Sequence, residues 1–383
     1  MQQTLTILPT AVIRRLGQSY ATWFQHSKSF VLLEEPAYDV LQLYNEGEPA
    51  DRIISVCNEK YGHLEENIPA FTHEMIEIFQ HFNHPENAVT FSLDPSVIKS
   101  VPDSVYSVKT YQLGSKAVSV HYQNEFLEFS IHPLFAHLAV SDSPIAAHSI
   151  ELFENTRFCF FRYNSQIVDI FKKKHLEFFT GSVKQQIYST LYNRDYNSWM
   201  MALHASGIIK NNQAILFSAV GGSGKSTISA MLKAHGYGYL SDDFITADEN
   251  GEVYPFPAAI SVKQGAAETL SEFYPELKDM NPERAHTGKQ VRYLPVHNHT
   301  EIREAPYPVR ALVFIGYNKQ APFLFEEVEK KDALQLLLKE TWVNPVPENV
   351  SRFFAWIENT RFFRLRYSKT AEALDATDKL FAL

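Results

Sequence analysis

The sequence predicts an α/β fold in which a P-loop domain follows a small winged-helix-like domain made of a β-hairpin and three helices. Three observations support this. An apolar run at residues 214–217 leads into a glycine-rich loop and a helical segment. A pair of aspartates follows the next apolar run, at 237–240. Before position 85, short β-like runs precede three amphipathic stretches. We therefore expect two domains, residues 1–84 and 87–383.

Length and composition limit the class of protein. The chain has 383 residues, of which 45% are hydrophobic, so it can bury sizeable cores. Its net charge of -9 argues against a nucleic-acid partner, because phosphate backbones require a basic face. Its two cysteines, Cys57 and Cys159, are too few for a disulfide framework, and a reducing cytoplasm is the expected setting. No apolar run approaches the roughly 18 residues that span a bilayer, so we expect no membrane partner.

The N-terminal elements follow from local pattern. β-like runs occupy 12–16, 20–25 and 30–33, and a Gly-Gln-Ser turn separates the first two. Amphipathic helices are predicted over 37–44, 50–61 and 68–82, the first opened by Pro36. In the second of these, Ile53, Ile54, Cys57 and Tyr61 recur at helical spacing and define one buried face.

The middle of the chain carries weaker signals. Residues 117–122 and 126–131 are typical of strands, whereas 167–174 and 183–191 are helical or mixed. We expect these strands to complete the sheet of the P-loop domain, with a separate third domain as the alternative. Near the C-terminus, 332–339 and 370–381 are predicted to be amphipathic helices that pack on the sheet or on a partner subunit in a homo-oligomer.

The glycine-rich loop has the composition of a phosphate-binding loop. Its glycines allow the backbone to curl with positive φ, so that successive N–H groups can point at a phosphate. The following helix start favours anions, Lys225 can reach the outer phosphates, and the Ser226 hydroxyl can ligate magnesium. The pattern calls for glycine at position 219, where this chain has alanine. The loop residues predicted to bind nucleotide are Gly221, Gly222, Ser223, Gly224, Lys225, Ser226 and Thr227.

Asp242 and Asp243 come directly after the next predicted strand. Ligands in α/β proteins bind at the carboxyl ends of strands, so both carboxylates should lie near the phosphate loop. One could orient the metal while the other takes a proton from an attacking hydroxyl. A glycine-rich turn without a ligand is the alternative, and the ordered sequence of loop, Lys-Ser, helix and acid pair argues against it.

The first 84 residues resemble the precursor-peptide recognition domain of the pyrroloquinoline quinone pathway. The resemblance rests on Phe30-Val31-Leu32-Leu33, on the helix start at 36–41, on 45–48 and on 53–62. It implies that a peptide adds a strand to an exposed sheet edge.

The motifs around the glycine loop, taken together, resemble the kinase domain of the HPr kinase/phosphorylase family. They are 203–209 with its histidine, the loop 221–227 and the acid pair after Ser241, and the resemblance covers residues 202–262 well. It implies that His204 lies near the transferred phosphate and that Lys225 holds the β and γ phosphates. It further implies that Ser226 ligates magnesium, with Asp242 as the base and Asp243 at the metal. The sequence leaves open which carboxylate has which role, and His204 taken alone would be a structural histidine.

The chain departs from that family after the acid pair. The family's glycine- and arginine-containing signature is not found there, so neither phosphorolysis nor HPr as the substrate follows from the resemblance. Lys263 and Arg292 are further candidates for phosphate or substrate contacts, with ordinary surface cations as the alternative.

These observations predict an ATP- and Mg²⁺-dependent kinase that phosphorylates a hydroxyl, with serine expected, on a peptide or small protein such as a ribosomal precursor peptide. ATP is favoured because the Asn-Lys-Gln-Ala stretch at 318–321 lacks the aspartate of guanine-specific GTPases. Two alternatives remain, a kinase acting on a small molecule and a non-catalytic protein whose partner binding is gated by nucleotide.

Overall fold

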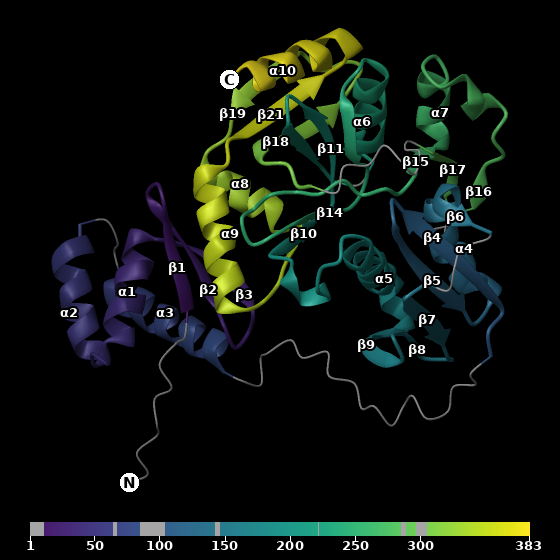
Figure 1. Ribbon diagram of the computed structural model, residues 1–383. Helices are drawn as coiled ribbons and strands as arrows, with labels where there is room; N and C mark the ends of the chain where they lie inside the picture. The colour runs from purple at the N-terminus through teal and green to yellow at the C-terminus, as the bar shows by residue number, and fades with distance from the viewer. Residues whose placement is uncertain are drawn as a thin grey trace. The chain divides into compact units, whose positions relative to one another are not determined.

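The computed structural model describes residues 11–63, 67–84, 104–141, 146–220, 222–284, 289–295 and 305–383. The chain divides into two compact units, and each is built from two segments (Figure 1). Unit 1 comprises Met1–Thr90 and Val328–Thr360, and unit 2 comprises Phe91–Glu327 and Arg361–Leu383. Val328–Thr360, a segment near the C-terminus, therefore belongs to the same unit as the N-terminal module, which is Met1–Thr90.

Unit 1 contains a three-stranded antiparallel sheet, in the order β1-β2-β3, followed by three helices. The predicted strands and helices of this region are present. Apolar side chains from the sheet and the helices form one core, which includes Phe24, Leu41, Ile53, Cys57 and Phe79. The elements are β1 (Ala11–Leu16), β2 (Ser19–Phe24), β3 (Ser29–Glu34), α1 (Glu35–Asn45), α2 (Ala50–Tyr61), α3 (Ile68–Asn83), α8 (Lys330–Leu337), β20 (Thr341–Val343) and α9 (Pro347–Asn359).

Helix α9 packs against the N-terminal sheet of unit 1. The ring of Phe30, on β3, lies 6.0 Å from the rings of both Phe353 and Phe354, in edge-on geometry. Arg14 on β1 forms an ion pair with Glu358 at the end of the helix. Aromatic edge contacts add to the burial of apolar area, so this helix contributes to the stability of the N-terminal module.

Unit 2 contains a six-stranded mixed sheet in the order β6-β4-β5-β7-β8-β9. Helices α4 and α5 bury Leu127, Ile131, Phe179 and Val183 in the core of this sheet. The elements are β4 (Ser107–Leu113), β5 (Lys116–Tyr122), α4 (Glu125–Phe135), β6 (Ala139–Val140), β7 (His148–Glu154), β8 (Phe158–Tyr163), β9 (Gln166–Lys172) and α5 (Leu176–Leu191).

Two expectations for this region were wrong. Residues 126–131 lie in helix α4 and not in a strand, because Asn124 caps the helix by accepting a hydrogen bond from the Leu127 N–H at 3.0 Å. In addition, the strands of 107–172 form a sheet of their own and do not extend the sheet that carries the glycine loop. Both sheets nevertheless belong to unit 2.

The second six-stranded sheet of unit 2 has the order β13-β11-β12-β18-β21-β19. Strand β11 pairs antiparallel with both β12 and β13, whereas β12, β18 and β21 pair parallel. Helices α6, α7 and α10 share one core with this sheet, and α6 and α10 are seen beside it in Figure 1. The predicted packing of the last helix on the sheet is confirmed. The elements are β11 (Ala205–Lys210), β12 (Gln213–Ser218), α6 (Lys225–Ala234), β13 (Gly238–Ser241), β18 (Val309–Tyr317), β19 (Leu324–Glu327), β21 (Phe362–Tyr367) and α10 (Thr370–Ala382).

Shorter elements complete unit 2. Strands β10 and β14 pair antiparallel, and β15, β17 and β16 form a small sheet beside helix α7. Their bounds are β10 (Met201–Leu203), β14 (Ile245–Ala247), β15 (Ile260–Lys263), α7 (Gln264–Leu270), β16 (Glu283–Arg284) and β17 (Gln290–Leu294).

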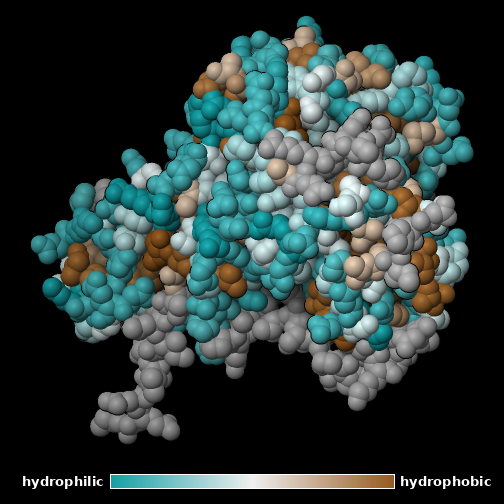
Figure 2. Space-filling view, viewed as in Figure 1, coloured by the Kyte–Doolittle hydropathy of each residue, from teal (hydrophilic) through white to brown (hydrophobic). Residues whose placement is uncertain are grey.

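The surface in Figure 2 is mainly hydrophilic, and both cysteines lie in the interior. Hydrophilic side chains predominate on the face shown in Figure 2, where apolar surface occurs in small separate patches. Cys57 and Cys159 are both buried free thiols. Within the described ranges, no helix is long and apolar enough to cross a membrane.

Candidate active site

The glycine loop joins the central strand β12 to helix α6. Gly222 and Gly224 have φ values of 94° and 99°, in the region that glycine adopts without strain. Gly224 is the N-cap of α6, so the free N–H groups of the first helical turn face the loop. Gly221 lies outside the described residues. Ala219 does not have a positive φ, and its methyl group packs on the apolar core, which explains why alanine is tolerated there.

Lys225 is the first residue of α6, and only 7% of it is exposed. Its Nζ donates a hydrogen bond to the Ala219 carbonyl at 2.5 Å, so the ammonium group folds back over the loop. Ser226 and Thr227 follow in the first helical turn, where the helix dipole favours an anion. The loop, the helix start and the lysine therefore concentrate positive potential at one place.

Sheet topology brings the acid pair and the histidine to the same edge. Strands β12 and β13 run in the same direction because both are antiparallel to β11. Their carboxyl ends thus lie at one edge, with the glycine loop after β12 and the acid pair after β13. His204 directly precedes β11, whose first residue, Ala205, is paired with Ser218 at the end of β12. The three motifs that are separate in the sequence meet at this edge.

Asp243 lies between the side chains of His204 and Lys184. The Nε2 atom of His204 is 2.8 Å from Oδ1 of Asp243, and Nζ of Lys184 is 3.7 Å from Oδ2. Desolvation raises the pKa of Asp243. The hydrogen bond from His204 and the charges of Lys184, His204 and Lys225 outweigh it and hold the pKa well below its usual range. Asp243 is therefore an anion at any physiological pH.

Asp242 has a different environment. It is 4% exposed, and its Oδ2 accepts a hydrogen bond from the Ser261 N–H at 2.8 Å. Burial, and next the negative charge of Asp243, raise the pKa of Asp242 to about 6, against the lowering influence of Ser226, Ser261 and Lys263. Among the described residues, its buried Oδ1 has no hydrogen-bond partner. Because an unpaired buried oxygen is costly, this atom is suited to receive a ligand or a proton.

The residues present fit a magnesium ion held jointly with phosphates. The described part of the chain holds no group of three His, Cys, Asp or Glu side chains able to cage a metal. Magnesium, however, commonly takes one or two carboxylates and fills its other positions with water and phosphate oxygens. The Ser226 hydroxyl, which lies beside the acid pair, and the ionised Asp243 supply such oxygens at one edge of the sheet.

Lys263 and Arg292, the other two predicted contact residues, have different surroundings. Lys263, at the end of β15, is close enough to Asp242 for its charge to lower the pKa of that carboxyl. Arg292 donates hydrogen bonds to the Met280 carbonyl at 2.9 Å and to the Gln264 side chain at 2.8 Å. The structure therefore brings Lys263 to the acid pair and engages Arg292 in contacts around helix α7.

Lys184 and Ser261 were not identified from the sequence. Lys184 lies on α5, 15% of its side chain is exposed, and its ammonium group faces both Asp243 and the Phe244 ring. The residues around Lys184 in the sequence form no motif that predicts this contact, because the contact depends on how α5 packs. Ser261 contributes a backbone N–H, and any residue except proline would supply that donor.

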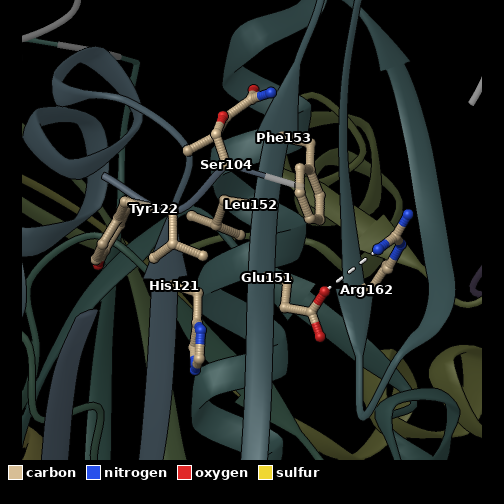
Figure 3. A pocket seen from close by; sticks show the side chains of 9 residues that line it. Ser104, His121, Tyr122, Glu151, Leu152, Phe153 and Arg162 are labelled. Carbon is tan, nitrogen blue, oxygen red and sulfur yellow. Dashed lines mark hydrogen bonds and ion pairs between the residues drawn. The ribbon is translucent and has the colours of Figure 1, made fainter. Parts of the chain in front are cut away.

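A separate hollow of about 210 Å³ lies on the outer face of the mixed sheet (Figure 3). It is lined by His121, Glu151, Phe153 and Arg162, among others, and none of the predicted site residues contributes. Arg162 pairs with Glu151 at 3.4 Å and covers the Phe153 ring at 4.7 Å. These contacts satisfy the charged groups, so the chemistry concentrates at the glycine loop and not here.

No protein-family model matches the chain, and no curated protein matches it. Among solved structures, the chain is similar to that of the Hpr(Ser) kinase/phosphatase from Coxiella burnetii, with 12% sequence identity and a TM-score of 0.24. The match covers 47% of this chain and 97% of that one.

Proposed function

We propose that the protein is an ATP- and Mg²⁺-dependent P-loop kinase of the HPr kinase type, acting on a hydroxyl of a peptide or small protein. A serine hydroxyl of a ribosomal precursor peptide is the expected acceptor. The observation that carries the proposal is the environment of Asp242. This buried carboxyl has one unpaired oxygen and a pKa raised to about 6, at the sheet edge that carries the glycine loop. A base so placed is suited to accept the proton of the attacking hydroxyl in phosphoryl transfer.

In the proposed reaction, the acceptor oxygen bonds to the γ-phosphorus of ATP as the bond from that phosphorus to the β–γ bridging oxygen breaks. Asp242 accepts the proton of the hydroxyl, and ADP leaves with the electron pair of the broken bond. With a pKa of about 6, Asp242 is largely ionised at neutral pH and still basic enough to assist.

The other side chains position and neutralise charge. Lys225 would exchange the Ala219 carbonyl for the β and γ phosphates, with the loop N–H groups beside it. His204 and Lys184 hold Asp243 in place and keep it ionised. A magnesium ion, held by Ser226 and Asp243, would offset negative charge on the phosphates.

Recruitment of the acceptor is assigned to the N-terminal module of unit 1. The assignment follows from the resemblance of residues 1–84 to the precursor-peptide recognition domain, and the module consists of three strands followed by three helices. Strand β3 lies at an edge of the three-stranded sheet. An extended peptide could pair with the free backbone groups of that edge.

The activity can be tested with peptides encoded by genes adjacent to the gene for this protein. Each peptide is incubated with the full-length protein, ATP and Mg²⁺, and its mass is then measured. We expect the mass of one phosphate to be added to a serine-containing peptide, with no transfer by Lys225→Ala. Binding of ATP without transfer to any hydroxyl would favour the nucleotide-gated binding protein. Transfer to small alcohols but to no peptide would favour the small-molecule kinase.

A further inference from the structure

Two tyrosines end the strands that neighbour the glycine loop. Tyr317 is the last residue of β18 and Tyr367 the last of β21, and the two are directly paired in register. Because β18 pairs parallel with β12, both tyrosines lie at the edge where the glycine loop begins. Neither takes part in the proposed transfer step.

Both side chains approach the start of helix α6. A Cβ placed on Gly224 would lie 3.6 Å from the Tyr317 Cβ and 3.7 Å from the Tyr367 hydroxyl. The two rings are 5.5 Å apart at an interplanar angle of 55°. The pair therefore borders the N-terminal end of the helix, where the phosphates of a nucleotide would be held.

The two tyrosines differ in how far their side chains are exposed. Tyr317 is 46% exposed, so its ring is accessible to a ligand at this edge of the sheet. Tyr367 is only 4% exposed, and its hydroxyl makes no hydrogen bond within the described residues. The ring is buried while the hydroxyl lies beside the loop, so this oxygen is placed to pair with a ligand held there.

We propose that Tyr317 and Tyr367 form the subsite for the nucleoside part of the bound nucleotide. The exposed ring of Tyr317 stacks on the base, and the Tyr367 hydroxyl donates a hydrogen bond to the nucleotide. Tyr367 also supports the Tyr317 ring through their contact. This inference rests on the proposed nucleotide-binding function and adds the residues that distinguish a nucleotide from a bare polyphosphate.

The test compares two ligands that share a phosphate chain. The affinities of the full-length protein for ATP and for inorganic tripolyphosphate are measured by calorimetry with Mg²⁺ present. Tyr317→Ala should weaken ATP binding about tenfold or more, as expected for loss of one base–aromatic stack, and leave tripolyphosphate binding unchanged. Tyr317→Phe keeps the ring and should retain the affinity for ATP. Tyr106→Ala removes another exposed tyrosine, which precedes β4, and serves as the matched control.

The outcomes separate the two proposals. If Tyr317→Ala leaves ATP affinity unchanged, or weakens both ligands equally, the base subsite is refuted while phosphate binding at the loop stands. Retained tripolyphosphate binding in the variant also shows that it has folded. If the unmodified protein binds neither ligand, the proposed function and the subsite both fail.

Discussion

At the scale of single residues, the two adjacent aspartates have opposite environments. Asp243 is held ionised by His204 and neighbouring cations, whereas Asp242 is buried with a pKa raised to about 6. Pairs of carboxyls whose pKa values are separated in this way are typical of sites that need one fixed charge and one base. The structure thus gives the two carboxyls different environments, a difference that the sequence left open.

The raised pKa of Asp242 has a consequence for stability. Since its pKa is about 6 in the folded chain and near 3.8 when unfolded, ionisation costs on the order of 3 kcal/mol in the folded state. The cost is absent below about pH 4 and complete above about pH 6. Asp242→Asn should therefore increase the free energy of unfolding at pH 7.5 by up to ~3 kcal/mol, with the gain disappearing near pH 4. Denaturant titrations at both pH values measure this, and a variant less stable than wild type at pH 7.5 would contradict it.

Lys263 should also influence the pKa of Asp242. Its positive charge lowers the pKa of Asp242, so Lys263→Met should raise that pKa and move the acid limb of the pH–rate profile to higher pH. Lys278→Met, at an exposed lysine after helix α7, is the control and should leave the limb in place. An unchanged limb in Lys263→Met would show that the lysine does not act on the base.

At the scale of elements, the loop depends on backbone conformations that only glycine adopts easily. Gly224 has φ 99° at the start of α6, so Gly224→Ala should reduce the free energy of unfolding by about 1–2 kcal/mol and weaken ATP binding. Gly181 lies inside helix α5 with open space around it, and Gly181→Ala should instead be neutral or stabilising by about 0.5–1 kcal/mol. Thermal unfolding of both variants makes the comparison. Equal effects would mean that the loop conformation carries no strain for alanine.

Local sequence predicted the elements that local interactions determine. The strand, loop and helix around Gly224 and the acid pair after β13 follow from patterns within about 30 residues. Helix α4 was missed because its apolar residues resemble a strand and its cap, Asn124, was not recognised. The separate mixed sheet and the position of Lys184 could not be predicted, because they depend on pairing and packing between distant segments.

At the scale of the whole molecule, unit 1 is assembled from two distant segments of the chain. Removing residues 1–84 would leave Phe353 and Phe354 without their contact to Phe30. Such a truncation should therefore aggregate or unfold at a lower temperature, whatever its effect on substrate recruitment. Point changes in β3 are a cleaner probe of peptide binding.

Proline at the edge strand tests recruitment. Successive N–H groups of an antiparallel edge strand point alternately toward the neighbouring strand and away from it. Of Val31→Pro and Leu32→Pro, one should disturb pairing with β2, and the other should remove an outward donor. The variant that keeps the unfolding temperature closer to wild type should raise KM for the peptide severalfold with kcat unchanged. No change in KM would argue against strand addition at this edge.

Asp242 is the proposed base for phosphoryl transfer, and the rate of transfer to the acceptor peptide tests this role. Single-turnover transfer is followed from about pH 5 to pH 8 in wild type and in Asp242→Asn, together with ATP affinity. We predict that the wild-type rate falls as the pH drops through about 6. Asp242→Asn should bind ATP normally and lose transfer by at least about 100-fold. Transfer by Asp242→Asn at the wild-type rate, with the same pH dependence, would contradict the claim.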